Sequence, residues 1–500
     1  MSLSFVQEPV DATEKVPVIT NWTPLIGYML YYNASIASLF YFKLILEIRI
    51  DDASGTLLGK VKQRRNGYST DIANNKARAY FDLRDIVNTQ LVNTVYDQNQ
   101  SGVPFESIHT LGSNTGATTK IFSQNGNIQL GKSQIQQIYV KGYFQSSSSA
   151  SASPQEDATG AVNSTLFYMQ GALPLFTPRS VIGGSVDTDY LQGDNMAIYC
   201  PNGTSKKFLS DLQLSTGDYI SGTFYRNYIQ STDYHTLAFL NGQNDFNTST
   251  YYMEIAYYDS SNGLIGSKQY LINDSGNGGA IPATSGGEVN TDEERLLYFG
   301  CGAGNLEAST IDGSTTHRPS NFTNWAYYTI RVTSNNTGTI SYQSLPYYFI
   351  KQDASCKGFK IRRLAFRNSL GCYDYFNFKK KSTQTVNVER NNYSSMLGTF
   401  NKSKWRYDDY QRGKTTRQTT AVLQETLNTD WITEQDADLI EKLIMSTDVY
   451  IVENETPVIT PTQAVMVTSS SHIRKTQAND GMKIQYTINI EYANPLNTNS

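Results

Sequence analysis

The chain has 500 residues, with 41 Lys and Arg against 45 Asp and Glu and a formal net charge of -4. One hydrophobic core supports only about 250 to 300 residues, so this length predicts several domains. The small net charge excludes a whole-chain attraction to nucleic acid or to an anionic membrane, and neither partner is expected. The 35 Tyr among many Asn, Ser, Thr and Gly residues favour strands and turns over helices.

The N-terminal segment predicts neither export nor membrane insertion. Residues 1–15 carry acidic side chains and have no basic region followed by an apolar one, unlike a secretory signal. The most apolar stretch, residues 39–50, is interrupted by Lys43, Glu47 and Arg49 and is too short for a membrane span of about 20 residues. We therefore interpret it as a strand.

The first predicted domain, residues 1–144, begins with strands. The alternating pattern of residues 44–50 ends at a Gly-containing turn, and residues 56–61 are the expected hairpin partner. Residues 77–83 predict another strand, and 84–94 a short helix. The Ser- and Ala-rich residues 145–159 predict an exposed linker or long loop, because they offer little apolar surface to bury.

The second predicted domain, residues 145–290, is a Tyr- and Asn-rich insertion of β-sandwich or jelly-roll type that ends at a second linker, residues 274–290. Its expected strands are 219–225, 235–240, 251–258 and 268–272. Paired tyrosines such as Tyr251-Tyr252 and Tyr257-Tyr258 are typical of sheet packing and protein interfaces, and carbohydrate binding stays an alternative.

Two further domains are predicted, residues 291–430 and 431–500. The first has expected strands at 295–300, 325–332, 338–343, 347–352 and 360–366. The second starts with a helix capped by Thr433 and ending near Ser446. Strands follow at 449–453, 457–460, 464–468 and 483–492, and the last alternates apolar and polar residues strictly. The sequence thus predicts a mainly β, multidomain protein of β-sandwich or jelly-roll type with a short helix-plus-strands C-terminal region.

Residues that could carry chemistry are sparse. The four histidines, His109, His235, His317 and His472, lack metal-motif spacing and are interpreted as surface residues. The glycines of residues 300–304 lack the strand-then-helix context of a phosphate loop. The four cysteines are far apart and are expected to be reduced thiols.

Carboxylate pairs are the remaining route to catalysis, since glycoside hydrolysis uses two carboxyl groups across one bond. Adjacent pairs such as Asp408-Asp409 and Glu293-Glu294 would point to opposite faces of a strand and make poor sites. We therefore assign no catalytic, cofactor-binding or metal-binding residue and predict no enzymatic activity. One basic stretch stands out and is interpreted as a solvated face or a subunit contact: Lys379 to Lys381, Lys402, Lys404, Arg406, Arg412, Lys414 and Arg417.

Residues 363–378, RLAFRNSLGCYDYFNF, combine a strand, an Asn-x-x-Gly turn and an aromatic-Asp-aromatic run. This segment resembles structural proteins of tailed phages that infect Bacteroidetes-type bacteria, crAss-like phages included. Segments near both ends of the chain are similar to the same group, namely 40–50 with 79–83, 417–419, 430–431, 446–450, 457–459 and the last strand. The resemblance leaves residues 145–290 unmatched.

The resemblance implies a virion structural protein without catalytic activity: a ring-forming tail, neck or baseplate component that assembles in the host cytoplasm. The implied partners are copies of itself and other tail or neck proteins, without specific nucleic acid. A capsid decoration or fibre-anchoring head protein is the alternative within virions. A host-glycan-binding or glycan-cleaving tail protein is the alternative of another class, and an outward-projecting insertion could meet the host surface.

Overall fold

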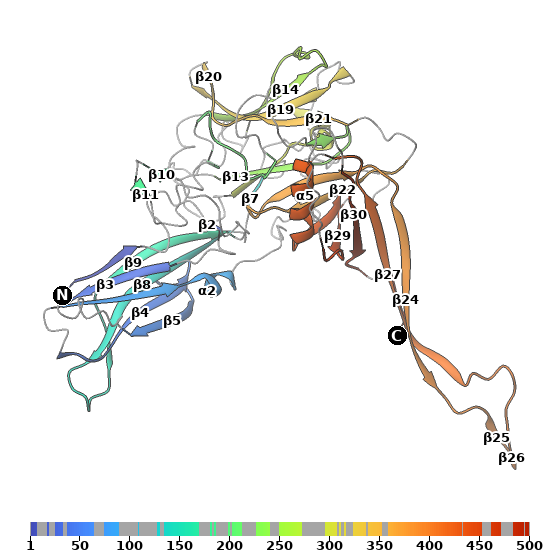
Figure 1. The fold of residues 1–500 in the computed structure, drawn as a ribbon, viewed down its shortest axis with the longest axis horizontal. Coiled ribbons are helices and arrows are strands. Elements are labelled where there is room, and N and C mark those ends of the chain that lie inside the picture. Colours follow the sequence, from blue (N-terminus) through green and yellow to red (C-terminus); the bar gives the residue numbers. More distant parts are fainter. Residues whose placement is uncertain are drawn as a thin grey trace. The chain divides into compact units, whose positions relative to one another are not determined.

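The computed structural model is mainly β and divides into two compact units (Figure 1). Unit 1 comprises Met1–Gln352 and Arg367–Asp374, and unit 2 comprises Asp353–Phe366 and Tyr375–Ser500. The structure describes residues 2–7, 18–19, 26–33, 38–64, 75–89, 109, 128–130, 135–169, 181–182, 185–186, 199–200, 203–212, 227–240, 250–272, 296–307, 310–311, 315–316, 324–336, 339–352, 359–432, 434–452, 462–471, 484–494 and 496–499.

Unit 1 begins with a sandwich of two sheets. The three-stranded sheet has the order β1 (Ser2–Gln7), β3 (Ile26–Tyr32) and β6 (Lys76–Asp82). The five-stranded sheet has the order β2 (Val18–Ile19), β9 (Gln155–Met169), β8 (Ile135–Ser147), β4 (Phe40–Ile50) and β5 (Leu57–Arg64). A five-residue helix, α2 (Arg84–Asn88), follows β6.

Alternation along β4 explains why the two sheets pack. Leu44, Leu46 and Ile48 join one buried core with residues of the three-stranded sheet, whereas Glu47 lies on the other face. Across the core, the Tyr31 ring centroid lies 5.1 Å from that of Phe42 and 4.6 Å from that of Phe144. Burying these side chains on both inner faces is what stabilises the sandwich.

The Ser-rich segment 145–159, predicted as an exposed linker or long loop, is the end of a β-hairpin with a shorter exposed loop. Strands β8 and β9 pair up to Ser146 and Gln155, so only residues 148–154 connect them. The side-chain oxygen of Ser147 donates to the carbonyl oxygens of Ser149 and Ala152, at 2.7 and 3.0 Å. Ser residues therefore close a tight turn here, and a boundary at residue 144 would fall inside β8.

The two larger remaining sheets of unit 1 bring together strands from the segments 145–290 and 291–430, and one of them also contains residues 128–130. The larger sheet contains β12 (Tyr228–Ile229), β21 (Tyr347–Lys351), β19 (Tyr327–Asn336), β14 (Thr250–Tyr258), β15 (Gln269–Ile272) and β20 (Thr339–Tyr342). A three-stranded sheet contains β13 (Thr236–Leu240), β16 (Leu296–Gly300) and β7 (Ile128–Leu130). Smaller elements are β10 (Val181–Ile182), β11 (Ser185–Val186), α4 (Ala303–Glu307), β17 (Thr310–Ile311) and β18 (Thr315–Thr316).

Aromatic side chains fill the space between these sheets. The ring of His235, next to β13, lies 4.8 Å from Phe349 of β21, and Phe208 lies 6.2 Å from Phe239 of β13. Tyr257, at 1% exposure, lies 5.0 Å from Tyr328. The packing interpretation is thus confirmed for Tyr257, whereas the side chains of Tyr251 and Tyr252 lie outside the described set.

Unit 2 is built on one long antiparallel sheet. The order is β23 (Tyr373–Phe378), β22 (Arg362–Arg367), β28 (Val449–Val452), β29 (Thr462–Val467), β30 (Thr487–Tyr492), β27 (Lys414–Asn428) and β24 (Thr383–Ser394), with β31 (Asn497–Asn499) also beside β27. The helix α5 (Glu434–Met445) buries Leu439, Ile440 and Leu443. Strands β25 (Thr399–Asn401) and β26 (Lys404–Arg406) pair at the end of the β24–β27 hairpin (Figure 1).

The mainly β fold with antiparallel sheets is confirmed, and the jelly-roll topology stays a prediction. Most strands expected from alternation are present within a residue or two, as is the helix before β28. The helix predicted at 84–94 is wrong in length, because α2 ends at Asn88. Expected strands at 219–225 and 457–460 and the linker 274–290 lie outside the described residues.

Candidate functional site

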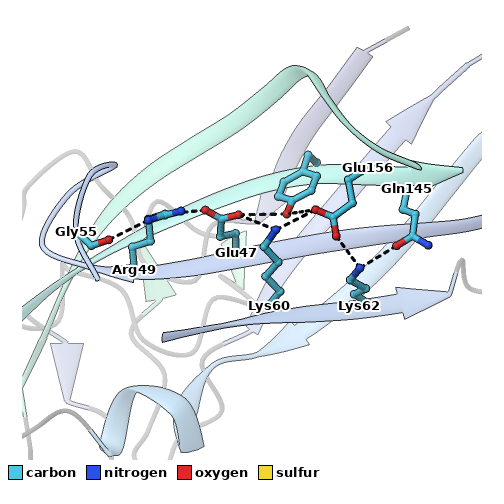
Figure 2. A network of polar contacts seen from close by, with 8 residues as sticks. Glu47, Arg49, Gly55, Lys60, Lys62, Gln145 and Glu156 are labelled. Atoms are coloured by element: carbon cyan, nitrogen blue, oxygen red, sulfur yellow. Dashed lines mark hydrogen bonds and ion pairs between the residues drawn. The ribbon is translucent and has the colours of Figure 1, made fainter. Parts of the chain in front are cut away.

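A network of charged side chains crosses four strands on the outer face of the first sandwich (Figure 2). The ammonium group of Lys60 lies 3.4 Å from the Glu47 carboxylate and 2.9 Å from that of Glu156. The Tyr143 hydroxyl donates to both carboxylates, at 3.2 and 3.0 Å. Arg49 binds Glu47 at 2.7 Å, and Lys62 binds Glu156 at 2.6 Å.

Both carboxyl groups of this network have lowered pKa values, so neither is a proton donor at neutral pH. Hydrogen bonds from Lys62 and Lys60 lower the pKa of Glu156 to about 2. Burial acts to raise the pKa of Glu47, but hydrogen bonds from Arg49 and Tyr143 lower it overall. A glycosidase needs one carboxyl group with a raised pKa as its proton donor. Two ionised carboxylates that pair with Lys and Arg instead stabilise the contact between neighbouring strands.

A second polar cluster is buried in unit 1 at the turn between β22 and β23. The amide nitrogen of Asn368 donates to the Leu209 carbonyl and to Asp374, at 3.0 and 3.1 Å. Its side-chain oxygen accepts from the backbone N–H groups of Leu370 and Cys372, both at 3.0 Å. Gly371, at φ 81°, adopts the left-handed conformation that such a turn requires. The Asn-x-x-Gly pattern is therefore a capped turn.

Asp374, fully buried, links this turn to residues 209–212. Its carboxylate accepts from the Ser210 hydroxyl at 2.5 Å and from the Asp211 backbone N–H at 3.0 Å. Burial and the nearby Asp211 carboxylate raise the pKa of Asp374 above its ordinary value. The hydrogen bonds to the Asp374 carboxylate come from Asn368 in the turn and from Ser210 and Asp211, so the cluster acts as a structural joint within unit 1.

The glycines of residues 300–304 do lie between a strand, β16, and a short helix, α4, contrary to our prediction. The N–H groups of Gly302 and Gly304 are already occupied, because they donate to the carbonyl oxygens of His235 and Asp233, at 3.0 and 2.9 Å. A Cβ atom on Gly302 would lie 2.3 Å from the His235 nitrogen. These glycines therefore permit close packing of backbones, and the helix is too short to offer an anion site.

The histidines and carboxylate pairs singled out in the sequence lie in different parts of the structure. His109 and His235 are buried, at 2% and 0% exposure, so their assignment to the surface is wrong. Asp408 and Asp409 lie in the exposed segment after β26, not on a strand. His317, His472, Glu293 and Glu294 lie outside the described residues. Among the residues that the structure describes, no group of three or more His, Cys, Asp or Glu could hold a metal ion.

The most exposed feature of unit 2 is a long two-stranded ribbon, which we call the arm and define as residues 383–428. Its strands β24 and β27 pair from Thr383 with Thr426 to Ser394 with Lys414. The base of β27 also pairs with β30 and β31, as far out as Thr419. Beyond that point lies the outer arm, residues 391–418, which in the described part of the chain forms strand pairs only with itself.

The outer arm exposes large nonpolar side chains. It carries seven of the 21 exposed ones found among the described residues: Tyr393, Met396, Leu397, Phe400, Trp405, Tyr407 and Tyr410. Tyr410 is 79% and Met396 77% exposed. The tip is nevertheless ordered internally, because the Trp405 indole N–H donates to the Leu397 carbonyl at 2.9 Å and Gly398, at φ 95°, lies against that ring.

The outer arm is also cationic. Six of the basic residues noted in the sequence lie on it, all exposed: Lys402, Lys404, Arg406, Arg412, Lys414 and Arg417. Asp408 and Asp409 are its two acidic residues, so its formal charge is +4. Since the formal charge of the whole chain is -4, the residues outside the outer arm together carry -8. Aromatic residues, Met and Arg are enriched in protein interfaces, and the outer arm exposes all three kinds of side chain.

Comparisons with known proteins give no assignment, since no protein-family model matches the sequence and no curated protein is detectably similar to it. Within the described residues, none of the helices has the length and hydrophobicity needed to cross a bilayer. The outer arm is the candidate functional site on its geometry alone, because it exposes large nonpolar and basic side chains together.

Proposed function

We propose that this protein is a structural component of a tailed-phage virion, a ring-forming part of the tail, neck or baseplate that assembles with copies of itself and catalyses no reaction. The resemblance of residues 363–378 to such proteins supports the virion assignment. The observation that carries the assembly proposal is the exposed outer arm.

An outer arm that no other molecule covers leaves nonpolar side chains and strand edges in water, which is energetically unfavourable. A two-stranded ribbon is marginally stable in water, and its open edges invite pairing with other chains. Proteins protect such edges with charged side chains, proline or bulges, and residues 391–418 contain six Lys and Arg residues but no proline. A bulge does occur, between Asn391 and Asn392, but the nonpolar side chains lie beyond it. A neighbouring molecule that covers the arm would remove this surface from water.

Two alternatives stay open as proposals. A capsid decoration or fibre-anchoring head protein would use the same arm in a different part of the particle. A host-glycan-binding protein is favoured by one observation, namely that Trp405, Tyr407 and Tyr410 are exposed and could stack on sugar rings. In the central Tyr-rich segment, by contrast, Tyr257 is buried.

Native mass spectrometry of the purified chain, together with imaging of intact particles, tests the proposal. A closed ring of roughly six or twelve copies is the expected result. A trimer would favour a fibre or spike and the glycan alternative. A chain that is monomeric both at high concentration and in isolated particles would overturn the assembly proposal.

A further inference from the structure

We propose that the outer arm of one copy binds the acidic remainder of a second copy of this chain, so that neighbouring copies join head to tail. This inference rests on the proposed self-assembly and specifies which surfaces meet. It commits to a protein partner, and a nucleic-acid partner is treated below as an outcome that would overturn it.

Charge separates the outer arm from the rest of the molecule. The outer arm carries +4 on 28 residues, whereas the other 472 residues carry -8. The two parts of the chain thus carry opposite formal charge, and oppositely charged parts of two copies attract when the copies meet. A second copy therefore offers the arm a partner of opposite sign without any other protein.

The same charges disfavour the simplest alternative, in which two arms pair with each other. Adding one arm to the edge of another would place the strands about 4.8 Å apart. This separation is well within the screening length of about 8 Å at physiological salt, so two surfaces of +4 would repel. An arm-to-arm contact would also leave the acidic remainder of both copies unused.

Nonpolar side chains add to the binding free energy of this contact, beyond the attraction between charges. The outer arm has 28 residues, comparable to the roughly 20 to 30 residues that each side of a standard protein interface contributes. Phe400, Trp405 and Tyr407 lie near its tip at 67%, 44% and 67% exposure. Aromatic residues of this kind supply much of the binding energy in such interfaces. Aliphatic neighbours such as Met396 and Leu397 favour a protein over a nucleic-acid strand.

Head-to-tail contact has a geometric consequence that matches the proposed function. When a patch on one copy binds a different patch on the next copy, each copy both donates and accepts. The series then closes into a ring or continues as a filament, whereas self-complementary contact stops at a dimer. The charge asymmetry therefore points to a ring or a filament and not to a pair.

The decisive experiment mixes the intact chain with a chain that lacks the outer arm. Because Arg390 pairs with Thr419 across the ribbon, residues 391–418 can be replaced by the two-residue turn Asn-Gly while β24 and β27 keep their inner pairs. We expect this variant not to assemble alone but to join the intact chain in native mass spectra, because it keeps the accepting surface. Circular dichroism of the variant checks that the sheets still form.

Each outcome has a distinct meaning. If the armless variant assembles alone as the intact chain does, the arm inference is wrong while self-assembly stands. If it neither assembles nor joins the intact chain, the contact is between arms and the head-to-tail inference is overturned. If the intact chain itself is monomeric in solution and in particles, the proposed function fails as well.

A charge variant separates electrostatic from nonpolar contributions. Lys402→Glu, Lys404→Glu and Arg406→Glu together should weaken assembly at least tenfold, and assembly of the intact chain should weaken as salt is raised. The control reverses Arg64, Lys381 and Arg390, which are also exposed but lie outside the outer arm, and should change assembly less than threefold. Equal effects of both variants would contradict a specific role of the outer arm.

Nucleic acid is tested with the same proteins. A fluorescent single-stranded oligonucleotide should bind the intact chain no more tightly than the armless variant. Tight binding that is lost with the outer arm, together with assembly that is unaffected, would assign the arm to nucleic acid and overturn the inference.

Discussion

Replacement of Asn368 is the sharpest test of how the turn between β22 and β23 is held. The side chain is buried, at 4% exposure, and makes four hydrogen bonds at 3.0 to 3.1 Å, two as donor and two as acceptor. Asn368→Ala removes all four and leaves the backbone N–H groups of Leu370 and Cys372 without these acceptors. The turn and the neighbouring residues 209–212, which Asn368 holds together, should therefore open before the rest of unit 1.

The magnitude follows from the groups left behind. Each hydrogen bond contributes about 1 kcal/mol, and a buried polar group without a partner costs about 1 to 3 kcal/mol. Since some of these groups can recruit water, we expect Asn368→Ala to lower the free energy of unfolding of unit 1 by about 3 to 5 kcal/mol. Asn368→Asp should be worse at neutral pH, because it turns two donors into acceptors beside the Asp374 carboxylate.

Hydrogen exchange is the appropriate assay, because it reports on the opening of each of the two compact units separately. The amide protons of residues 209–212 and 368–374 should exchange faster in both variants, while those of β28 in unit 2 should keep their rates. Ser395→Ala, at an exposed position of the arm, serves as the control. A decrease below about 1 kcal/mol for Asn368→Ala would refute this description of the turn.

Three further predictions concern other parts of the fold. Gly302→Ala should destabilise unit 1 by about 2 to 4 kcal/mol in thermal unfolding, because its Cβ would lie 2.3 Å from the His235 nitrogen, whereas Gly203→Ala, with open space at that position, should not. Arg362→Met should destabilise unit 2 by about 3 to 5 kcal/mol, because Arg362 lies 2.7 Å from the fully buried Glu425 carboxylate; an unchanged melting temperature would contradict this. Unfolded Glu156 has its ordinary pKa of 4.5 and the folded group one of about 2, so its stabilising effect is complete above 4.5 and is lost as pH falls to 2. Stability curves between pH 5 and 2 should therefore be flatter for Glu156→Gln, and parallel curves would exclude this role.

Alternating hydrophobicity predicted the strands that have one buried face. Residues 44–50 are an example, as are residues 487–492 of the predicted strand 483–492, and nonpolar side chains such as Leu44 and Ile488 are buried there. The same reasoning missed β24, whose residues are all exposed, so its sequence TQTVNVERNNYS shows no strong alternation. A strand without a buried face leaves little signal of this kind. The one sign of the arm in the sequence was its basic residues.

The polar clusters could not be located from sequence because their partners are distant along the chain. Lys60 and Glu156 are joined only because β5, β4, β8 and β9 lie side by side. Asp374 was visible as the centre of an aromatic-Asp-aromatic run, but its partner Ser210 lies 164 residues away. Such contacts follow from strand order, which local patterns do not specify.

The exposed arm also makes the chain sensitive to proteases in a way that depends on its surroundings. Trypsin cleaves after Lys and Arg, and the outer arm presents six of these residues at exposed positions within 28 residues. In the head-to-tail scheme, an unassembled copy would be clipped there while an assembled copy would be protected. A clipped copy would keep its accepting surface but lose its donor, so one cleavage would convert a building block into a terminator of growth.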